Sequence, residues 1–405
     1  MNDKENFEEL HEQYIAPTYG SRELTIVKGE GVYLYDNDGK KYIDCMSNFG
    51  VNILGHNNQE INEAIQNQLL KLSNLHGSFV NDQRSIFAKK LVEASPGLSK
   101  VFFCNSGAEA IEAAIKFSTI YNNKSKFLSA KMGYHGKTTG SLSLTNTLPK
   151  YKKPFLNLLL NTDSFSYNDI ESFKEVLDDD VGAIFIEVIQ GESGIRPADK
   201  EFLTDVQKIC NERNILFIVD EIQTGMGRTG KLFASDLYDL KPDMITLAKG
   251  ICAGLPAAAL LINEKISEKL YKGCHTNTFG GNPLISAAGI ATLNYIDEHN
   301  LFENATDVGN YFITELKKIE SSLVREIRGV GLMIAIELKV KCSKYAKLMQ
   351  DKGLLVIPTG STVLRLLPPI IFSKENVDES IEIKLGKKIF VDEVSHCCSR
   401  IKRSV

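Results

Sequence analysis

The stretch Ile215-Leu-Phe-Ile-Val-Asp-Glu-Ile-Gln-Thr-Gly225 decides the fold, because an unbroken apolar run ends there in two carboxylates and a glycine. Five consecutive apolar residues are typical of a strand buried on both faces of a parallel sheet. Open α/β sheets bind their ligands at the carboxyl ends of such strands. Asp220 therefore marks a predicted ligand site, although a lone aspartate here more often caps the next element.

Similar apolar runs recur along the chain, at residues 100–104, 126–130, 181–188, 244–247 and 257–262. Amphipathic segments separate them, so the sequence predicts an α/β architecture with a mostly parallel central sheet. Further helices are predicted over about 59–72 and 83–94, before the alternation begins. These segments together predict a large domain spanning residues 51–299.

A second, smaller α+β domain is predicted from about residue 300 to 390. Helical patterns at 303–321, 343–352 and after Ser373 alternate with strands at 324–328, 332–338, 354–357 and 363–366. Residues 1–50 contain a predicted hairpin, 31–44, which turns at Asn37, Asp38 and Gly39 and is expected to pack with this domain. Residues 391–405 are interpreted as a frayed tail. Its His396-Cys-Cys398 is a weak alternative, and no metal site is predicted.

Composition excludes several classes of protein. The 405 residues are 43% hydrophobic and 24% charged, which excludes general disorder. Lys and Arg total 47 against 51 Asp and Glu, a balance of −4 that requires neither a nucleic-acid nor a membrane partner. No run reaches the ~20 apolar residues of a membrane helix. The polar start and eight cysteines without CxxC spacing predict a cytoplasmic protein with reduced thiols.

A lysine follows a second apolar strand. Met244-Ile-Thr-Leu247 is followed by Ala248-Lys249-Gly250. A lysine desolvated at a strand end loses basicity and becomes a nucleophile toward carbonyl groups. A lysine that forms a Schiff base and an aspartate that keeps a pyridine nitrogen protonated are the two polar groups that a pyridoxal phosphate site requires. Lys249 and Asp220 therefore predict that cofactor.

The start of the predicted helix after residue 104 could hold the cofactor phosphate. Ser106 is a predicted N-cap, with Glu109 three positions on completing a capping box. The free N–H groups and the dipole of a helix start together form an anion site. Tyr134, after a third strand, could stack on the cofactor ring, although an aromatic there would more often be a core residue.

Six segments resemble the class III, subgroup II aminotransferases, which are pyridoxal phosphate enzymes of fold type I. They are Asn105–Ala110, Tyr134–Gly136, Gln190–Glu192, Asp220–Gly230, Ala248-Lys249 and Thr278–Pro283, and the similarity extends from about Leu24 to Asp378. The eleven-residue block from Asp220 is the most specific. Within the class, the chain is similar to the acetylornithine and acetyllysine aminotransferases. Residues 140–145, 149–151 and 154–155 resemble the variety whose substrate is attached to a small acidic amino-group carrier protein.

The resemblance implies a role for each matching position. Lys249 is the catalytic residue, which carries the cofactor and then moves the proton between substrate and cofactor. Asp220 pairs with the pyridinium, Gln223 reaches the ring hydroxyl, and Ile222 packs on the ring face opposite Tyr134. The phosphate is held by Ser106, Gly107 and Ala108 and by Thr278 of the neighbouring subunit, so a homodimer with a shared active site is implied.

The substrate residues are also implied by the resemblance. Arg365 would bind the α-carboxylate of glutamate or 2-oxoglutarate, and Glu192 would pair with Arg365 when a terminal amine occupies the site. A purely structural ion pair is the alternative. Asn277 would lie near the substrate. Lys137 stands where the family usually has arginine. A lysine keeps the positive charge but lacks the guanidinium fork that binds a carboxylate through two hydrogen bonds. The glycine run after the catalytic lysine is thinned over 251–254.

The implied function is transfer of the terminal amino group of N-acetylated or carrier-bound ornithine or lysine to 2-oxoglutarate, in arginine or lysine biosynthesis. A 4-aminobutyrate transaminase and an aminomutase are alternatives within the class, and a non-catalytic binding paralogue is an alternative outside it. An acidic carrier would be steered by Lys150, Lys152 and Lys153, which are predicted to form an exposed basic loop.

Overall fold

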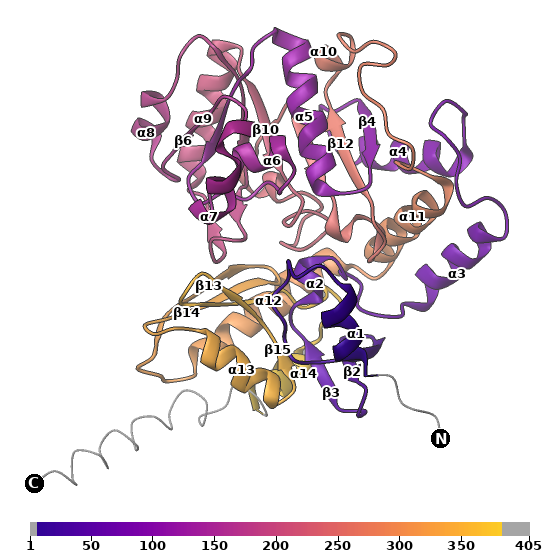
Figure 1. Ribbon diagram of the computed structural model, residues 1–405, viewed down its shortest axis with the longest axis vertical. Helices are drawn as coiled ribbons and strands as arrows, with labels where there is room; N and C mark the ends of the chain where they lie inside the picture. Colours follow the sequence, from indigo (N-terminus) through magenta and orange to yellow (C-terminus); the bar gives the residue numbers. More distant parts are fainter. Residues whose placement is uncertain (1–5, 383–405) are drawn as a thin grey trace, which may run out of the picture.

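A seven-stranded sheet of order β4-β12-β11-β10-β7-β5-β6 forms the upper half of the molecule (Figure 1). The computed structural model describes residues 6–382, so the predicted tail with His396 lies outside the described residues. In chain order the strands are β4 (Lys100–Cys104), β5 (Lys126–Ala130), β6 (Thr162–Phe165), β7 (Val181–Ile186), β10 (Leu216–Asp220), β11 (Met244–Leu247) and β12 (Ala258–Ile262). β12 runs antiparallel to both of its neighbours, and the other pairs are parallel.

All the strands predicted for this sheet are present, with one addition. β6 was not predicted, because its sequence Thr-Asp-Ser-Phe is mostly polar. It is an edge strand paired only with β5, so a single side chain, Phe165, is buried. An edge strand needs no continuous apolar run, which explains why hydrophobic patterning does not reveal it.

Burial on both faces explains the apolar run of β10. Leu216 and Ile218 belong to an apolar cluster that includes α5 (Gly107–Asn122), whereas Phe217 and Val219 belong to a second cluster that includes α9 (Lys200–Arg213). Successive side chains of a strand point to opposite faces, so helices cover the sheet on both sides. This is the α/β fold with a mostly parallel sheet that the sequence predicts.

The lower half contains two four-stranded sheets (Figure 1). One consists of β13 (Val324–Val330), β14 (Met333–Leu338), β17 (Val363–Leu366) and β16 (Ile357–Thr359), with helices α12 (Leu301–Lys317), α13 (Ser343–Asp351) and α14 (Lys374–Ser380). The other consists of β1 (Ile26–Glu30), β2 (Tyr33–Asp36), β3 (Lys41–Asp44) and β15 (Leu354–Leu355).

The two ends of the chain meet in this second sheet. β3 and β15 pair in parallel, with Ile43 opposite Leu354. The predicted hairpin therefore joins the C-terminal segment, while the domain limits at residues 50, 299 and 390 stay predictions. The largest apolar cluster contains Ile43, Leu261 and Leu364, so it extends through both halves.

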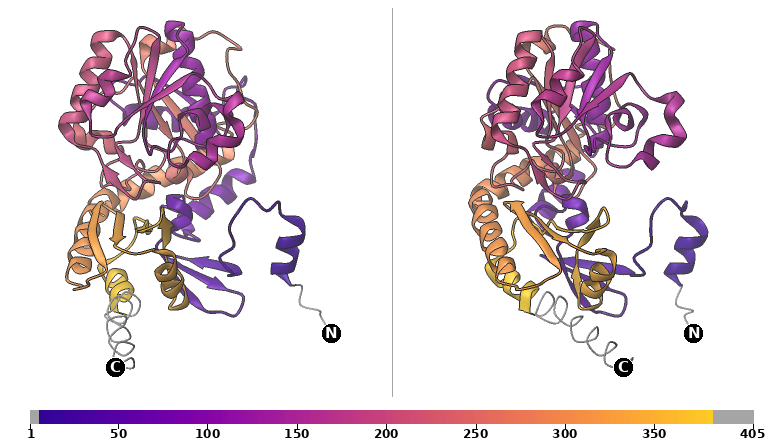
Figure 2. Two further views of the ribbon diagram at one scale, coloured as in Figure 1. Left: turned by 60° about the vertical axis from the view of Figure 1, so that its left-hand side comes forward. Right: turned by 90° about the vertical axis from the view of Figure 1, so that its left-hand side faces the viewer.

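Helices of the N-terminal third lie outside the sheets. α3 (Gln59–Leu69) and α4 (Asp82–Glu93) agree with the prediction and pack against α11 (Pro283–Glu298). α1 (Phe7–Tyr14) keeps its side chains exposed and stands away from the rest of the ribbon in both views of Figure 2. None of the helices within residues 6–382 is long and apolar enough to cross a membrane.

Candidate active site

The carboxyl edge of the seven-stranded sheet borders a cavity of about 420 Å³. Ten of the predicted site residues line it together: Ser106, Gly107, Ala108, Tyr134, Lys137, Glu192, Asp220, Ile222, Gln223 and Lys249. They come from segments that are far apart in the sequence, and the parallel strands bring their ends to one edge.

Asp220 ends β10 as a buried, oriented carboxylate. Its Oδ2 lies 2.7 Å from His135 Nδ1, and its Oδ1 accepts hydrogen bonds from the Ile222 N–H at 3.0 Å and the Thr246 hydroxyl at 3.2 Å. Burial would lower the pKa of His135, but the hydrogen bond to Asp220 and the charges of Asp220 and Glu187 outweigh it and raise the pKa. His135 therefore stabilises the negative charge of Asp220 through this hydrogen bond.

Lys249 lies two residues after the end of β11 and begins a short 3₁₀ helix, η3 (Lys249–Cys252). Its backbone is left-handed, with φ of 46°. Residues other than glycine rarely adopt this conformation, and those that do cluster at functional sites. Burial lowers the pKa of Lys249, and the nearby positive charge of Arg365 lowers it further against the opposing charge of Glu192. The amine is thus less basic than an exposed lysine, as predicted.

The start of α5, where the phosphate site is predicted, lines one part of the cavity. Ser106 is the N-cap, and its hydroxyl accepts a hydrogen bond from Glu109 N at 3.3 Å. The capping-box prediction was wrong in its second half: Glu109 Oε2 accepts from the backbone N and Nδ2 of Asn105, both at 2.9 Å. A Cβ on Gly107 would lie 2.8 Å from Ile222 Cδ1, so a larger residue here would displace the Ile222 side chain.

Arg365 and Glu192 form the ion pair that the family resemblance implies. Arg365 lies on β17 with a fully buried side chain, and its Nη2 is 2.7 Å from Glu192 Oε1. Its Nη1 donates to Gln223 Oε1 at 3.2 Å, while its Nε has no partner among the described residues. Burial would raise the pKa of Glu192, but the charge of Arg365 and its hydrogen bond lower it. Glu192 is therefore held as an anion.

Glu187 is a site residue that sequence reasoning missed. Its Oε2 accepts from Tyr134 N at 2.9 Å and its Oε1 from Gly191 N at 3.1 Å. Burial and the charge of Asp220 raise its pKa to about 7 against the opposing charge of His135. The predicted strand 181–188 placed Glu187 inside the sheet, whereas β7 ends at Ile186. A carboxylate next to a strand end was the signal available, as at Asp220.

A left-handed turn of the N-terminal segment was also missed. Ser47, Asn48 and Phe49 have φ of 44°, 49° and 60°, and Asn48 lines the cavity. Asp44 Oδ1 accepts from Met46 N and Ser47 N, both at 2.9 Å, which holds the turn. Gln223 Nε2 donates to the Phe49 carbonyl at 3.1 Å. Because this contact joins residues 174 positions apart, local sequence pattern contains no signal for it.

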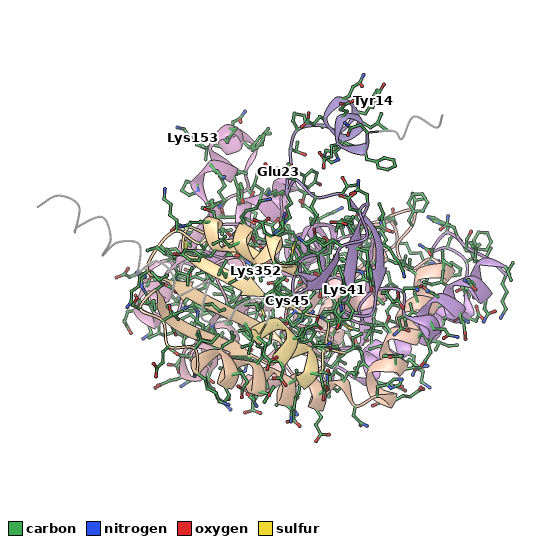
Figure 3. The ribbon with its side chains drawn as sticks, turned by 90° about the horizontal axis from the view of Figure 1, so that it is seen from below. Tyr14, Glu23, Lys41, Cys45, Lys153 and Lys352 are labelled. Atoms are coloured by element: carbon green, nitrogen blue, oxygen red, sulfur yellow. The ribbon has the colours of Figure 1, made fainter. Side chains whose placement is uncertain are left out.

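The exposed lysines predicted near the substrate include one, Lys152, that is not free. Lys137 is exposed, with Nζ 4.3 Å from the centroid of the Tyr151 ring. Lys152 is not a free surface charge: its Nζ donates to Ser143 O and Asn146 Oδ1, both at 2.7 Å, and burial lowers its pKa. Lys150 and Lys153 are exposed, and Lys153 is labelled at the margin of the molecule in Figure 3.

Asn277 and Thr278 lie outside this cavity. Asn277 Nδ2 donates to Phe103 O at 2.7 Å, and the residue lines a separate cavity of about 650 Å³ with His76 and Arg84. Thr278 is exposed beside it. One chain therefore does not bring these two residues to Lys249, and their predicted roles depend on a second subunit.

Comparison with known proteins identifies the family. The profile of the class-III aminotransferases matches residues 14–385. The chain belongs to this family. This aminotransferase is 41% identical over 375 residues to the acetylornithine aminotransferase of Aquifex aeolicus, covering 91% of this chain and 98% of that enzyme. It is 39% identical over 373 residues to the [LysW]-aminoadipate semialdehyde transaminase of Deinococcus radiodurans, covering 91% and 87%.

A solved structure supports the same assignment. The acetylornithine aminotransferase of Elizabethkingia anophelis superposes with a TM-score of 0.84 at 31% identity, covering 95% of this chain and 98% of that one. The predicted family and α/β fold of type I are confirmed.

The cofactor of this aminotransferase is pyridoxal phosphate, as predicted. The residues present fit it: Lys249 is a part-buried amine of lowered pKa at the cavity, Asp220 is an oriented carboxylate, and Gly107 leaves a space at a helix start that a Cβ would fill. An amine, a carboxylate and backbone N–H groups are the donor set that an aldehyde, a pyridine nitrogen and a phosphate require.

Proposed function

We propose that this aminotransferase moves the terminal amino group of an N-acylated ornithine or lysine to 2-oxoglutarate, in arginine or lysine biosynthesis. The observation that carries the proposal is the Arg365–Glu192 pair at 2.7 Å beside Lys249. A fully buried cation neutralised by a carboxylate that is 30% exposed can change partners when a dicarboxylate arrives.

The chain's own groups have separate tasks in this reaction. Pyridoxal phosphate supplies, when bound, an electron sink that stabilises the substrate carbanion. Asp220 would hold its ring nitrogen protonated, the N–H groups of Gly107 and Ala108 its phosphate, Gln223 its hydroxyl, and Tyr134 and Ile222 its ring faces. The lowered pKa of Lys249 favours its unprotonated amine. Its Nζ would move the proton between the amine-bearing substrate carbon and C4′ of the cofactor.

The ion pair lets one cavity accept two kinds of substrate. While a terminal amine is bound, Glu192 neutralises Arg365, so the amine meets no excess positive charge. When 2-oxoglutarate follows, its α-carboxylate takes over Arg365, and Glu192 moves toward solvent, where it is already partly exposed. Asn277 and Lys137 would contact the remainder of the substrate.

A homodimer with shared active sites is part of the proposal. Thr278 would complete the phosphate site of the partner. Apolar side chains in the same regions are exposed in one chain, namely Leu69, Leu70, Phe79, Val80, Tyr271 and Phe279, which supports burial against a second copy. Mixing Lys249→Ala with Thr278→Ala subunits should restore activity in one class of heterodimer site. Confirmed heterodimers without restored activity would show that each site is self-contained.

The blocking group on the donor is either acetyl or an acidic carrier protein, and the enzyme is proposed to act in the cytoplasm. The carrier alternative is supported by the exposed Lys150 and Lys153, which are followed in the chain by exposed apolar side chains at Phe155, Leu156 and Leu158. Charged rims of this kind raise association rates with partners of opposite charge.

A donor panel tests the proposed function. The purified enzyme would be supplied with 2-oxoglutarate and, in turn, N-acetylornithine, N-acetyllysine, a carrier-bound lysine or 4-aminobutyrate, with glutamate as the readout. Glutamate from an acylated diamine or its carrier-bound form supports the proposal. Glutamate from 4-aminobutyrate alone would assign the enzyme to that transaminase activity, and none from any donor would favour an aminomutase or a binding paralogue.

A further inference from the structure

The turn that carries Glu192 is strained. It is the tip of a short hairpin formed by β8 (Ile189–Gln190) and β9 (Arg196–Pro197), closed by a hydrogen bond from Gly194 N to Gly191 O at 3.1 Å. Ile195 has φ of 54° although it is β-branched and fully buried. Such a residue in the left-handed region is a conformational outlier and persists only where its surroundings hold it in place.

Arg328 of β13 holds the end of this turn. Its Nε donates to Ile195 O at 2.9 Å and to Gly194 O at 3.1 Å, and its Nη2 donates to Gly194 O at 2.6 Å. The guanidinium thus binds both carbonyls at the strained position. A planar fork with several N–H groups is needed for this, which a lysine does not offer.

The other side of Arg328 is fixed by carboxylates. Its Nη1 is 2.7 Å from Glu337 Oε2 and 2.7 Å from Glu326 Oε2. Both the Arg328 and Glu337 side chains are only 13% exposed. Arg325, on the same strand, also pairs with Glu337, with its Nη1 2.9 Å from Glu337 Oε1, but its side chain is 56% exposed.

We propose that Arg328 is a positioning residue for substrate exchange: it holds the 191–195 turn so that the Glu192 carboxylate stays on Arg365 until a dicarboxylate displaces it. The proposal rests on the proposed function for the alternation of substrates, whereas the clamp itself rests on the contacts above. It places the control of Glu192 on β13, in the half of the molecule that also carries Arg365.

Loosening the clamp has opposite effects on the two kinds of substrate. With the strained turn released, Glu192 spends less time on Arg365. A dicarboxylate then meets less competition from Glu192 for Arg365, so it binds more tightly. An amine donor instead meets an uncompensated cation and reacts more slowly. A residue that merely stabilises the fold would weaken both.

The test uses the holoenzyme with Arg328→Lys, which keeps the charge beside Glu337 and loses the fork. Arg325→Lys is the matched control, because Arg325 lies on the same strand and pairs with the same carboxylate, Glu337, without a hydrogen bond to the turn. Three quantities would be measured: amide hydrogen exchange of the 190–196 peptide, the Kd of glutarate by calorimetry, and kcat/KM for the amine donor. Each would be repeated in a Glu192→Gln background.

We expect Arg328→Lys to speed exchange of the 190–196 peptide, to tighten glutarate binding about threefold and to lower kcat/KM for the donor about fivefold. Arg325→Lys should leave all three unchanged. In the Glu192→Gln background the effects on glutarate and donor should vanish, since coupled residues are not additive. Unchanged exchange, equal weakening of both ligands, or effects that persist without Glu192 would overturn the proposal. Exchange and glutarate binding remain informative even if no acylated diamine is a donor.

Discussion

Replacing Glu192 by glutamine removes the negative charge from Arg365 and preserves the shape of the side chain. Breaking a buried ion pair costs about 3–5 kcal/mol because one charge is left uncompensated. Glu192 is 30% exposed, and the Gln amide oxygen can still accept the bond that Glu192 Oε1 accepts from Arg365 Nη2 at 2.7 Å. We therefore expect a loss of about 1–2 kcal/mol in the free energy of unfolding.

The same substitution should affect the two halves of the reaction differently, namely the step that takes the amino group from the donor and the step that gives it to 2-oxoglutarate. Glu192 raises the pKa of Lys249 and Arg365 lowers it, so removing Glu192 lowers that pKa further and leaves excess positive charge for the incoming amine. A change of about 1.4 kcal/mol corresponds to tenfold, so kcat/KM for the amine donor should fall about tenfold. The KM for 2-oxoglutarate should fall, because its carboxylate no longer competes with Glu192.

Half-reaction kinetics and urea denaturation measure these effects. Glu379→Gln is the control, since Glu379 pairs with Lys41 at 3.5 Å and does not line the cavity of Lys249. Equal losses in both half-reactions, or an unchanged amine half-reaction, would refute the reasoning and leave the Arg365–Glu192 contact a structural ion pair.

Four further predictions test other parts of the site. Ala253 has φ of 46°, so Ala253→Gly should raise the free energy of unfolding by about 1 kcal/mol in urea denaturation, and no gain would contradict the assigned backbone. The pKa of Glu187 is raised from 4.5 to about 7, so the folded state binds the extra proton and stability falls as pH rises between these values. Glu187→Gln should remove this decrease in the free energy of unfolding, which amounts to at most about 3 kcal/mol across that pH range. An unchanged slope of stability against pH would argue against the raised pKa. Lys249→Ala should abolish turnover and the borohydride-stable label on the chain, so a label that persists would place the cofactor elsewhere. Lys150→Ser with Lys153→Ser should raise KM for a carrier-bound donor and flatten its salt dependence but barely affect a free acetylated diamine, and equal losses would remove the support for a carrier.

The polar ends of the central strands could be predicted from sequence. The apolar runs before Asp220 and Lys249 predict strands, and parallel strands bring their ends to one edge whatever the loops between them do. The helix start at Ser106 follows from local capping chemistry. Arg365 and Glu192 came from the family resemblance, because an ion pair across 173 positions leaves no local pattern.

The remaining parts depend on packing that sequence pattern does not encode. Glu187 is predicted to lie inside a strand unless the end of that strand is known. The left-handed turn at Asn48 is joined to a distant segment by the hydrogen bond from Gln223 Nε2 to the Phe49 carbonyl, which no local pattern indicates. Lys152 reads as a surface charge, yet its stem is long enough to turn inward to two oxygen acceptors. Arg328 lies on a strand whose pattern shows only alternation, and its three bonds to the Glu192 turn appear only in three dimensions.

Isotope transfer tests the central claim most directly, that the cavity at Lys249 moves a terminal amino group to a dicarboxylate through the Arg365–Glu192 exchange. N-acetylornithine labelled with nitrogen-15 at its terminal amine would be incubated with the purified enzyme and 2-oxoglutarate, and the products analysed by mass spectrometry. The account predicts labelled glutamate from the wild type and none from Lys249→Ala. Label that stays in a rearranged amine, or glutamate that forms equally without Lys249, would contradict it.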